Sequence, residues 1–165
     1  MESRKSNGLS YVILAVVIAN LALTLSLWLN RSEPISGPPS SAQSLPDYAD
    51  SAYLASLADR MITLFNSQDY VTIYEGFDEL AKAQIGLDDV EREMGRLSEI
   101  LGKARNPAYV DHQASKHGVH DVYVLKYDIR LYDGAFDKGK MTISVVDRNN
   151  QFGVVGVNMI GGSTN

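Results

Sequence analysis

The chain has 165 residues, no cysteine and a formal net charge of −5 at pH 7. The absence of cysteine excludes structural disulfides, thiolate metal sites and cysteine nucleophiles. Residues 1–31 carry a net charge of +2 and residues 32–165 therefore carry −7. This acidic main portion argues against nucleic acid as a partner, because proteins that bind it need a basic surface.

The N-terminal tail, residues 1–8, precedes an uncharged run from Leu9 to Leu29. At about 1.5 Å rise per residue, this run is long enough to cross a hydrocarbon core of about 30 Å, so the sequence predicts a transmembrane helix over 9–29. Arg4 and Lys5 precede the run and Arg31 alone follows it closely, which places the N-terminus in the cytoplasm and the rest of the chain outside. A cleaved signal peptide is the alternative, but the run exceeds the usual length of its apolar region.

Residues 30–44 are rich in proline and serine, which is typical of an extended spacer rather than of a packed segment. Residues 45–165 remain, and their number suits one domain with a modest core. We therefore expect a cytoplasmic tail, one membrane span, a spacer and one extracytoplasmic domain.

Three helices are predicted at the start of this domain. The segment Ser44–Asp47 has the spacing of a capping box and predicts the start of the first helix, whose apolar positions continue to Phe65. The polar residues 66–69 end that helix. A second helix is predicted over 69–81 and a third over 88–102.

The apolar period then changes from helical to alternating, which predicts four strands over 108–113, 119–132, 140–147 and 152–160. Asn149 and Asn150 predict a tight turn between the last two, since asparagine tolerates positive φ. Short connections between successive strands favour an antiparallel meander. The predicted fold class is α+β, with three helices packed on a curved four-stranded antiparallel sheet.

This order of elements resembles that of the nuclear-transport-factor-two-like superfamily, whose members are also described as cystatin-like α+β cones. The segment NSQDYVTIY, Asn66 to Tyr74, resembles the join between the first two helices of such domains. The segment Leu87 to Gly102 resembles the third helix of small membrane-anchored bacterial members. The resemblance implies a cone-shaped domain, but the superfamily includes isomerases, dehydratases, ligand binders and envelope scaffolds, so it does not select a function.

Aromatic residues are the first candidate site, because in a cone-shaped domain some of them would line a cavity between helix and sheet. The alternative is that they close a small core, with their hydroxyl groups at its rim. The candidate pocket-lining residues are Tyr53, Tyr74, Tyr123, Tyr127 and Phe152.

Histidines are the second candidate, because His112 and His120 would lie close together if the chain turns near 116–118. Imidazole and carboxylate groups could then hold zinc, copper or nickel. The spacing lacks the pattern of a strong metal motif, and histidines at a hairpin tip are usually just solvated. We therefore expect no cofactor.

The predicted solvent face of the second strand is the third candidate, as a docking face for another protein. Its residues are Val122, Val124, Lys126, Asp128 and Arg130. The sequence contains no phosphate-binding loop or nucleophile elbow, and Asp128 alternates with apolar neighbours, so it is expected to face solvent rather than a cavity. No catalytic residue is predicted.

The sequence therefore favours a non-enzymatic role: a single-pass protein of the inner, cytoplasmic membrane, whose external domain binds an envelope protein or a second copy of itself. The alternative is a small-ligand carrier, or an isomerase or dehydratase that uses the cone cavity.

Overall fold

The computed structural model describes residues 44–117 and 119–162, and this part of the protein is an α+β domain. Its helices come first and its strands follow: α2 (Ser51–Asn66), α3 (Tyr70–Glu75), α4 (Glu79–Lys82), α5 (Leu87–Leu101), β1 (Lys103–His117), β2 (His120–Tyr132), β3 (Lys138–Arg148) and β4 (Gln151–Gly162). The strands form one open antiparallel sheet in the order β1-β2-β3-β4. The predicted class and meander are confirmed.

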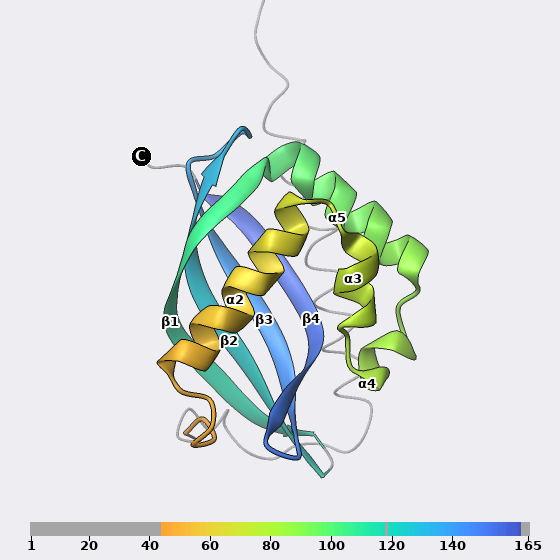
Figure 1. Ribbon diagram of the computed structural model, residues 1–165, viewed down its shortest axis with the longest axis vertical. Coiled ribbons are helices and arrows are strands. Elements are labelled where there is room, and N and C mark those ends of the chain that lie inside the picture. The colour runs from red at the N-terminus through yellow and green to blue at the C-terminus, as the bar shows by residue number, and fades with distance from the viewer. Residues whose placement is uncertain (1–43, 118, 163–165) are drawn as a thin grey trace, which may run out of the picture. The chain divides into compact units, whose positions relative to one another are not determined.

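Figure 1 shows α2 lying diagonally across the sheet, with the other three helices beside it towards the β4 side. Within the described ranges, no helix is both long and apolar enough to cross a membrane. The tail, the transmembrane helix predicted over 9–29 and nearly all of the spacer lie outside those ranges, so they remain predictions.

The first helix begins later than the capping-box spacing predicted. The backbone amide of Ala49 donates to the carbonyl of Pro46 at 2.9 Å, which makes residues 46–49 a turn. Asp50 then caps α2, because its carboxylate accepts a hydrogen bond of 2.8 Å from the backbone amide of Tyr53. An aspartate is as good an N-cap as the serine six residues earlier.

The predicted second helix is divided into α3 and α4. Between them Phe77 is buried and forms a bridge with Val154 of β4, and the amide of Asp78 donates to the Val154 carbonyl at 2.6 Å. The Asp78 carboxylate also caps α4 by accepting from the amide of Leu80 at 2.9 Å. Tertiary contacts with β4 therefore override the helical period of this segment.

Strand β1 is longer than the predicted 108–113. Strand β1 includes Asn106 and Pro107, and it is an edge strand whose pairing with β2 shifts between Arg105 and Ala108. A bulge on an edge strand tolerates both proline and the positive φ of 54° at Asn106. The turn at Asn149 and Asn150 is confirmed, with φ values of 52° and 64°.

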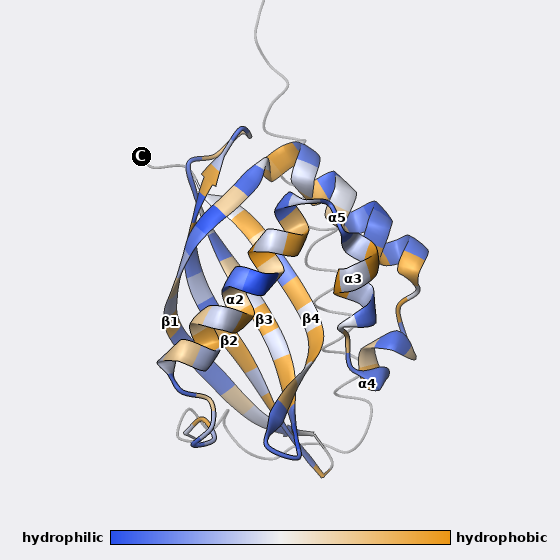
Figure 2. Ribbon diagram, in the orientation of Figure 1, coloured by the Kyte–Doolittle hydropathy of each residue, from blue (hydrophilic) through white to orange (hydrophobic). Residues whose placement is uncertain are grey.

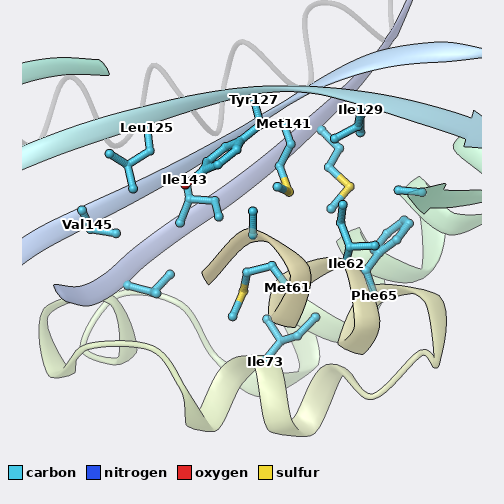
Figure 3. Close-up of a cluster of buried hydrophobic side chains, with 14 of the residues drawn as sticks. Met61, Ile62, Phe65, Ile73, Leu125, Tyr127, Ile129, Met141, Ile143 and Val145 are labelled. Carbon is cyan, nitrogen blue, oxygen red and sulfur yellow. The ribbon is translucent and has the colours of Figure 1, made fainter. Parts of the chain in front are cut away.

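The core lies between the helices and one face of the sheet. The predicted alternation in β2 is confirmed: every second residue from Tyr123 to Leu131 is buried. Figure 3 shows side chains of α2 and α3 facing those of β2 and β3. Figure 2 shows hydrophilic residues on the side of α5 that faces the viewer, as expected for a helix with one buried stripe. Full burial of a side chain such as Leu125 contributes about 1.5–3 kcal/mol.

Asn66 fixes the end of α2 to the start of β1. Its side-chain amide donates to the carbonyl of Ala104 at 2.7 Å, and its side-chain oxygen accepts from the amide of Ala104 at 2.9 Å. This pair satisfies backbone groups on the outer edge of β1 that no neighbouring strand could reach.

Since the helices and strands that the structure describes form one layered unit within residues 44–162, the chain truncated to residues 31–165 should be soluble and should unfold cooperatively in urea. The truncated chain lacks Trp28, the single tryptophan, so its fluorescence comes from tyrosine. Circular dichroism and tyrosine fluorescence should show unfolding transitions at the same urea concentration. Aggregation, or a gradual transition without a baseline, would show that the domain depends on the preceding residues or on a partner.

Candidate functional site: the outer face of the sheet

The face of the sheet opposite the core, here called the outer face, is the surface on which the predicted docking residues lie. The even-numbered residues of β2 point away from the buried odd-numbered ones, and their cross-strand partners share that face. The structure thus places the five predicted docking residues together: Val122, Val124, Lys126, Asp128 and Arg130.

One of these residues makes an ion pair on the outer face. Lys126 lies 3.6 Å from the carboxylate of Asp111, its direct partner on β1. Both side chains are partly exposed, so the pair contributes little to stability. Asp128 and Arg130 make no ion pair with any residue that the structure describes.

Two adjoining depressions lie on the outer face. The larger has a volume of about 540 Å³ and crosses all four strands near the start of β3, with Asn106, Arg130, Lys138 and Ile160 among its lining residues. The smaller, of about 130 Å³, shares Asp128, Lys140 and Ile160 with it and reaches Val110. Val110 and Ile160 are exposed, at 57% and 44%. The outer face therefore combines a hollow with apolar and charged side chains.

A row of basic side chains lies at the larger depression, and two of its members, Arg130 and Lys138, line it. Arg105 of β1 pairs directly with Arg130 of β2, which pairs in turn with Lys138 of β3, and all three are exposed. We call these three residues the cation row. Sequence reasoning found Arg130 but not its two neighbours, because only the strand register brings them together.

Charge is unevenly distributed between the two halves of the domain. The helical segment, residues 44–102, contains twelve acidic and four basic residues, a net charge of −8. The strand segment, residues 103–165, contains eight basic and six acidic residues, a net charge of +2. The basic character of the outer face thus stands out against an acidic helical layer.

The predicted pocket-lining aromatics belong to the packed side of the sheet. Tyr53 and Tyr123 both contact Phe152, with ring centroids 5.8 and 5.6 Å apart. The Tyr127 hydroxyl donates to the carbonyl of Leu54 at 3.1 Å, and burial raises the Tyr127 pKa above its ordinary value.

The fifth predicted pocket residue, Tyr74, lies apart from the other four, against Phe77 at 6.5 Å between ring centroids. Among the described residues, no polar or charged residue other than tyrosine is buried as a whole.

The two candidate histidines lie at different places on the β1–β2 hairpin. His112 pairs with Leu125 and so shares the face of the core, and its Nδ1 is 2.9 Å from the Tyr109 hydroxyl. His120 is five register positions away, at the tip of the hairpin. The structure does not bring them together. No group of three or more potential metal-ligating side chains occurs in the part of the chain that it describes.

An ion pair that sequence reasoning missed lies at the other end of the outer face. Arg148 Nε and Nη2 donate to the two carboxylate oxygens of Asp78 at 2.6 and 3.0 Å. The Asp78 side chain is only 8% exposed, whereas that of Arg148 is 38% exposed. The carboxylate lies where a side chain on Gly153 would otherwise be. The pair therefore fixes the α3–α4 join to the β3–β4 hairpin.

The pKa of Asp78 reflects two opposed effects. Burial alone would raise it, but hydrogen bonds from Arg148 and from the Leu80 amide favour the charged form and lower the pKa below its ordinary value of 3.8. The ionised Asp78 thus stabilises the folded state fully above pH 3.8, and this contribution is lost as the pH falls through the lowered pKa.

Replacement of Arg148 by glutamine should lower the free energy of unfolding by about 2 kcal/mol at pH 7, because the Asp78 carboxylate would keep only one of its donors. The difference from the unmodified protein should shrink as the pH falls below about 4, where Asp78 becomes protonated in the variant. Urea denaturation at several pH values measures both. Arg92→Gln is the matched control, since its pair with Asp89 is exposed, and it should unfold like the unmodified protein. An equal loss of unfolding free energy in Arg148→Gln and Arg92→Gln would show that the pair with Asp78 contributes no more than an exposed ion pair.

Replacement of Gly153 by alanine should destabilise the domain by about 1–3 kcal/mol, because the added Cβ would lie 2.5 Å from an Asp78 carboxylate oxygen. Gly156→Ala on the same strand is the control, since its Cβ would meet nothing closer than 4.0 Å. Thermal unfolding should separate the two variants, and similar midpoints would show that Asp78 moves aside without cost.

No protein-family model matches the sequence, and no curated protein matches it. The assignment of a function therefore rests on the residues and their geometry.

Proposed function

We propose that the protein is a single-pass protein of the inner membrane whose extracytoplasmic domain binds another envelope protein through the outer face of its sheet. The observation that carries the proposal is the larger depression on that face, which is bordered by exposed basic side chains and by the exposed Ile160. A hollow lined by both apolar and charged side chains is typical of an interaction site.

The free edge of β4 adds to this surface. Within the described ranges, the bridge to Phe77 covers the edge at Val154, and no further helix or strand is bonded along residues 156–162. An unpaired edge can accept an extended segment of a partner by strand addition. The larger depression reaches this edge at Ile160, Gly161 and Gly162.

The membrane part of the proposal is supported by the sequence alone. The uncharged run over 9–29, with Arg4 and Lys5 before it, favours an anchor with its N-terminus in the cytoplasm. The spacer over 30–44 would hold the domain away from the bilayer. The order of helices and then meander strands supports the proposed resemblance to the nuclear-transport-factor-two-like superfamily.

The carrier or enzyme alternative finds no specific support among the described residues. Such a role would use a cavity on the helical side of the sheet, with a carboxylate or histidine inside it. The aromatic side chains Tyr53, Tyr123 and Phe152 pack against one another there, and both depressions lie on the opposite face of the sheet.

Photo-crosslinking in cells tests the proposed docking surface. A photoreactive residue at Lys126 or Thr142, both on the outer face, should capture the same one or few envelope proteins. The same residue at Arg60 or Glu99, exposed positions on α2 and α5, should not capture them. Identical products from both faces, or only adducts of the protein with itself, would overturn the proposal.

A further inference from the structure

The cation row places three like charges side by side on the outer face. Arg105, Arg130 and Lys138 occupy directly opposite positions on three adjacent strands. Like charges directly opposite one another destabilise a sheet. None of the three forms an ion pair with any described residue, so the repulsion within the row is not relieved there.

The groups near the row carry charges of both signs. Lys140 lies next to the row on β3 and lines both depressions, opposite the single carboxylate of Asp128. Asp133 and Asp137 stand in the loop that joins β2 to β3. The Arg105 guanidinium lies over the Tyr132 ring, 5.1 Å from its centroid, which holds the arginine in place without neutralising it.

We infer that the cation row and the adjoining depression bind an extended acidic segment of the partner protein, through carboxylate groups. Adjacent strands are about 4.8 Å apart, so the row spans about 10 Å, and carboxylates on one side of an extended peptide repeat about every 7 Å. Two successive acidic side chains of that segment thus fit the length of the row. Arginine is suited to the task, since its planar group bonds a carboxylate through two donors. This inference rests on the proposed function and names the chemistry of its partner.

The chain itself does not supply a matching segment. Residues 1–43 contain only two acidic side chains, Glu2 and Glu33, against three basic ones. The helical layer is acidic, but six of its twelve acidic side chains already cap a helix or pair with a base. These six are Asp50, Asp69, Asp78, Glu79, Asp89 and Glu93. The other six lie within helices apart from Asp47, so the chain offers no extended acidic segment among these residues and a segment of another protein is favoured over the N-terminal residues or a second copy.

Binding of a fluorescent oligo-glutamate peptide to the full chain in non-ionic detergent tests the inference. Anisotropy should show binding that weakens as salt is raised, since exposed charges are screened within about 8 Å at physiological ionic strength. The double variant Arg105→Gln, Arg130→Gln should bind about tenfold more weakly or worse. The matched control is Arg60→Gln, Arg96→Gln, which removes the same charge from exposed positions on α2 and α5 and should bind like the unmodified protein.

Four results would overturn the inference. Oligo-glutamate could fail to bind, or oligo-glutamine could bind equally, which would assign recognition to the backbone edge alone. Vesicles of anionic lipid could bind through the row while the peptide does not, which would identify a membrane surface as the occupant. The double variant Arg105→Gln, Arg130→Gln could form a smaller oligomer in detergent than the unmodified protein, which would identify a second copy as the occupant.

This experiment is separable from the crosslinking test. If photo-crosslinking captures a partner but oligo-glutamate does not bind, only the acidic-segment inference fails. If the peptide binds but no partner is captured, the proposed docking function fails.

Discussion

The packing of α2 against one face of the sheet is the contact on which the rest of the domain depends. An antiparallel meander needs cover on only one side, and α2 provides it by burying Leu54, Met61 and Phe65 against alternate residues of β2 and β3. The face that α2 covers also determines which side chains of β2 are directed to the outer face. Since the residues of β2 alternate from Tyr123 to Leu131, each buried residue there leaves a neighbour directed outwards, and these neighbours form part of the surface proposed for binding.

Much of the fold follows from local patterns that agree with tertiary packing. The alternation in β2 predicted its buried face, and the paired asparagines predicted the β3–β4 turn. The start of α2 was wrong because Asp50 is a competing cap only a few residues further along. The prediction for β1 was too short because the first residues of this strand, which include Asn106 and Pro107, fit it only through a bulge at the edge of the sheet.

The candidate site was predictable only in part. Periodicity assigned the residues of β2 to the outer face, but it could not show which residues of the other strands lie beside them. Arg105 and Lys138 are separated from Arg130 by 25 and 8 residues in the sequence, and only the register aligns all three. The pair between Asp78 and Arg148 was hidden for the same reason, since it joins segments 70 residues apart.

The join between α3 and α4 has a consequence for the solubility of the domain. Phe77 and Asp78 occupy the edge of β4 at Val154, and the contact with Arg148 keeps them there. By covering this part of the edge, the segment prevents β4 from pairing there with a strand of another molecule. If strong acid or mutation released it, the open edge would extend from Gly162 back to Val154 while most of the core stayed intact. Aggregation would then begin from a nearly native protein rather than from an unfolded one.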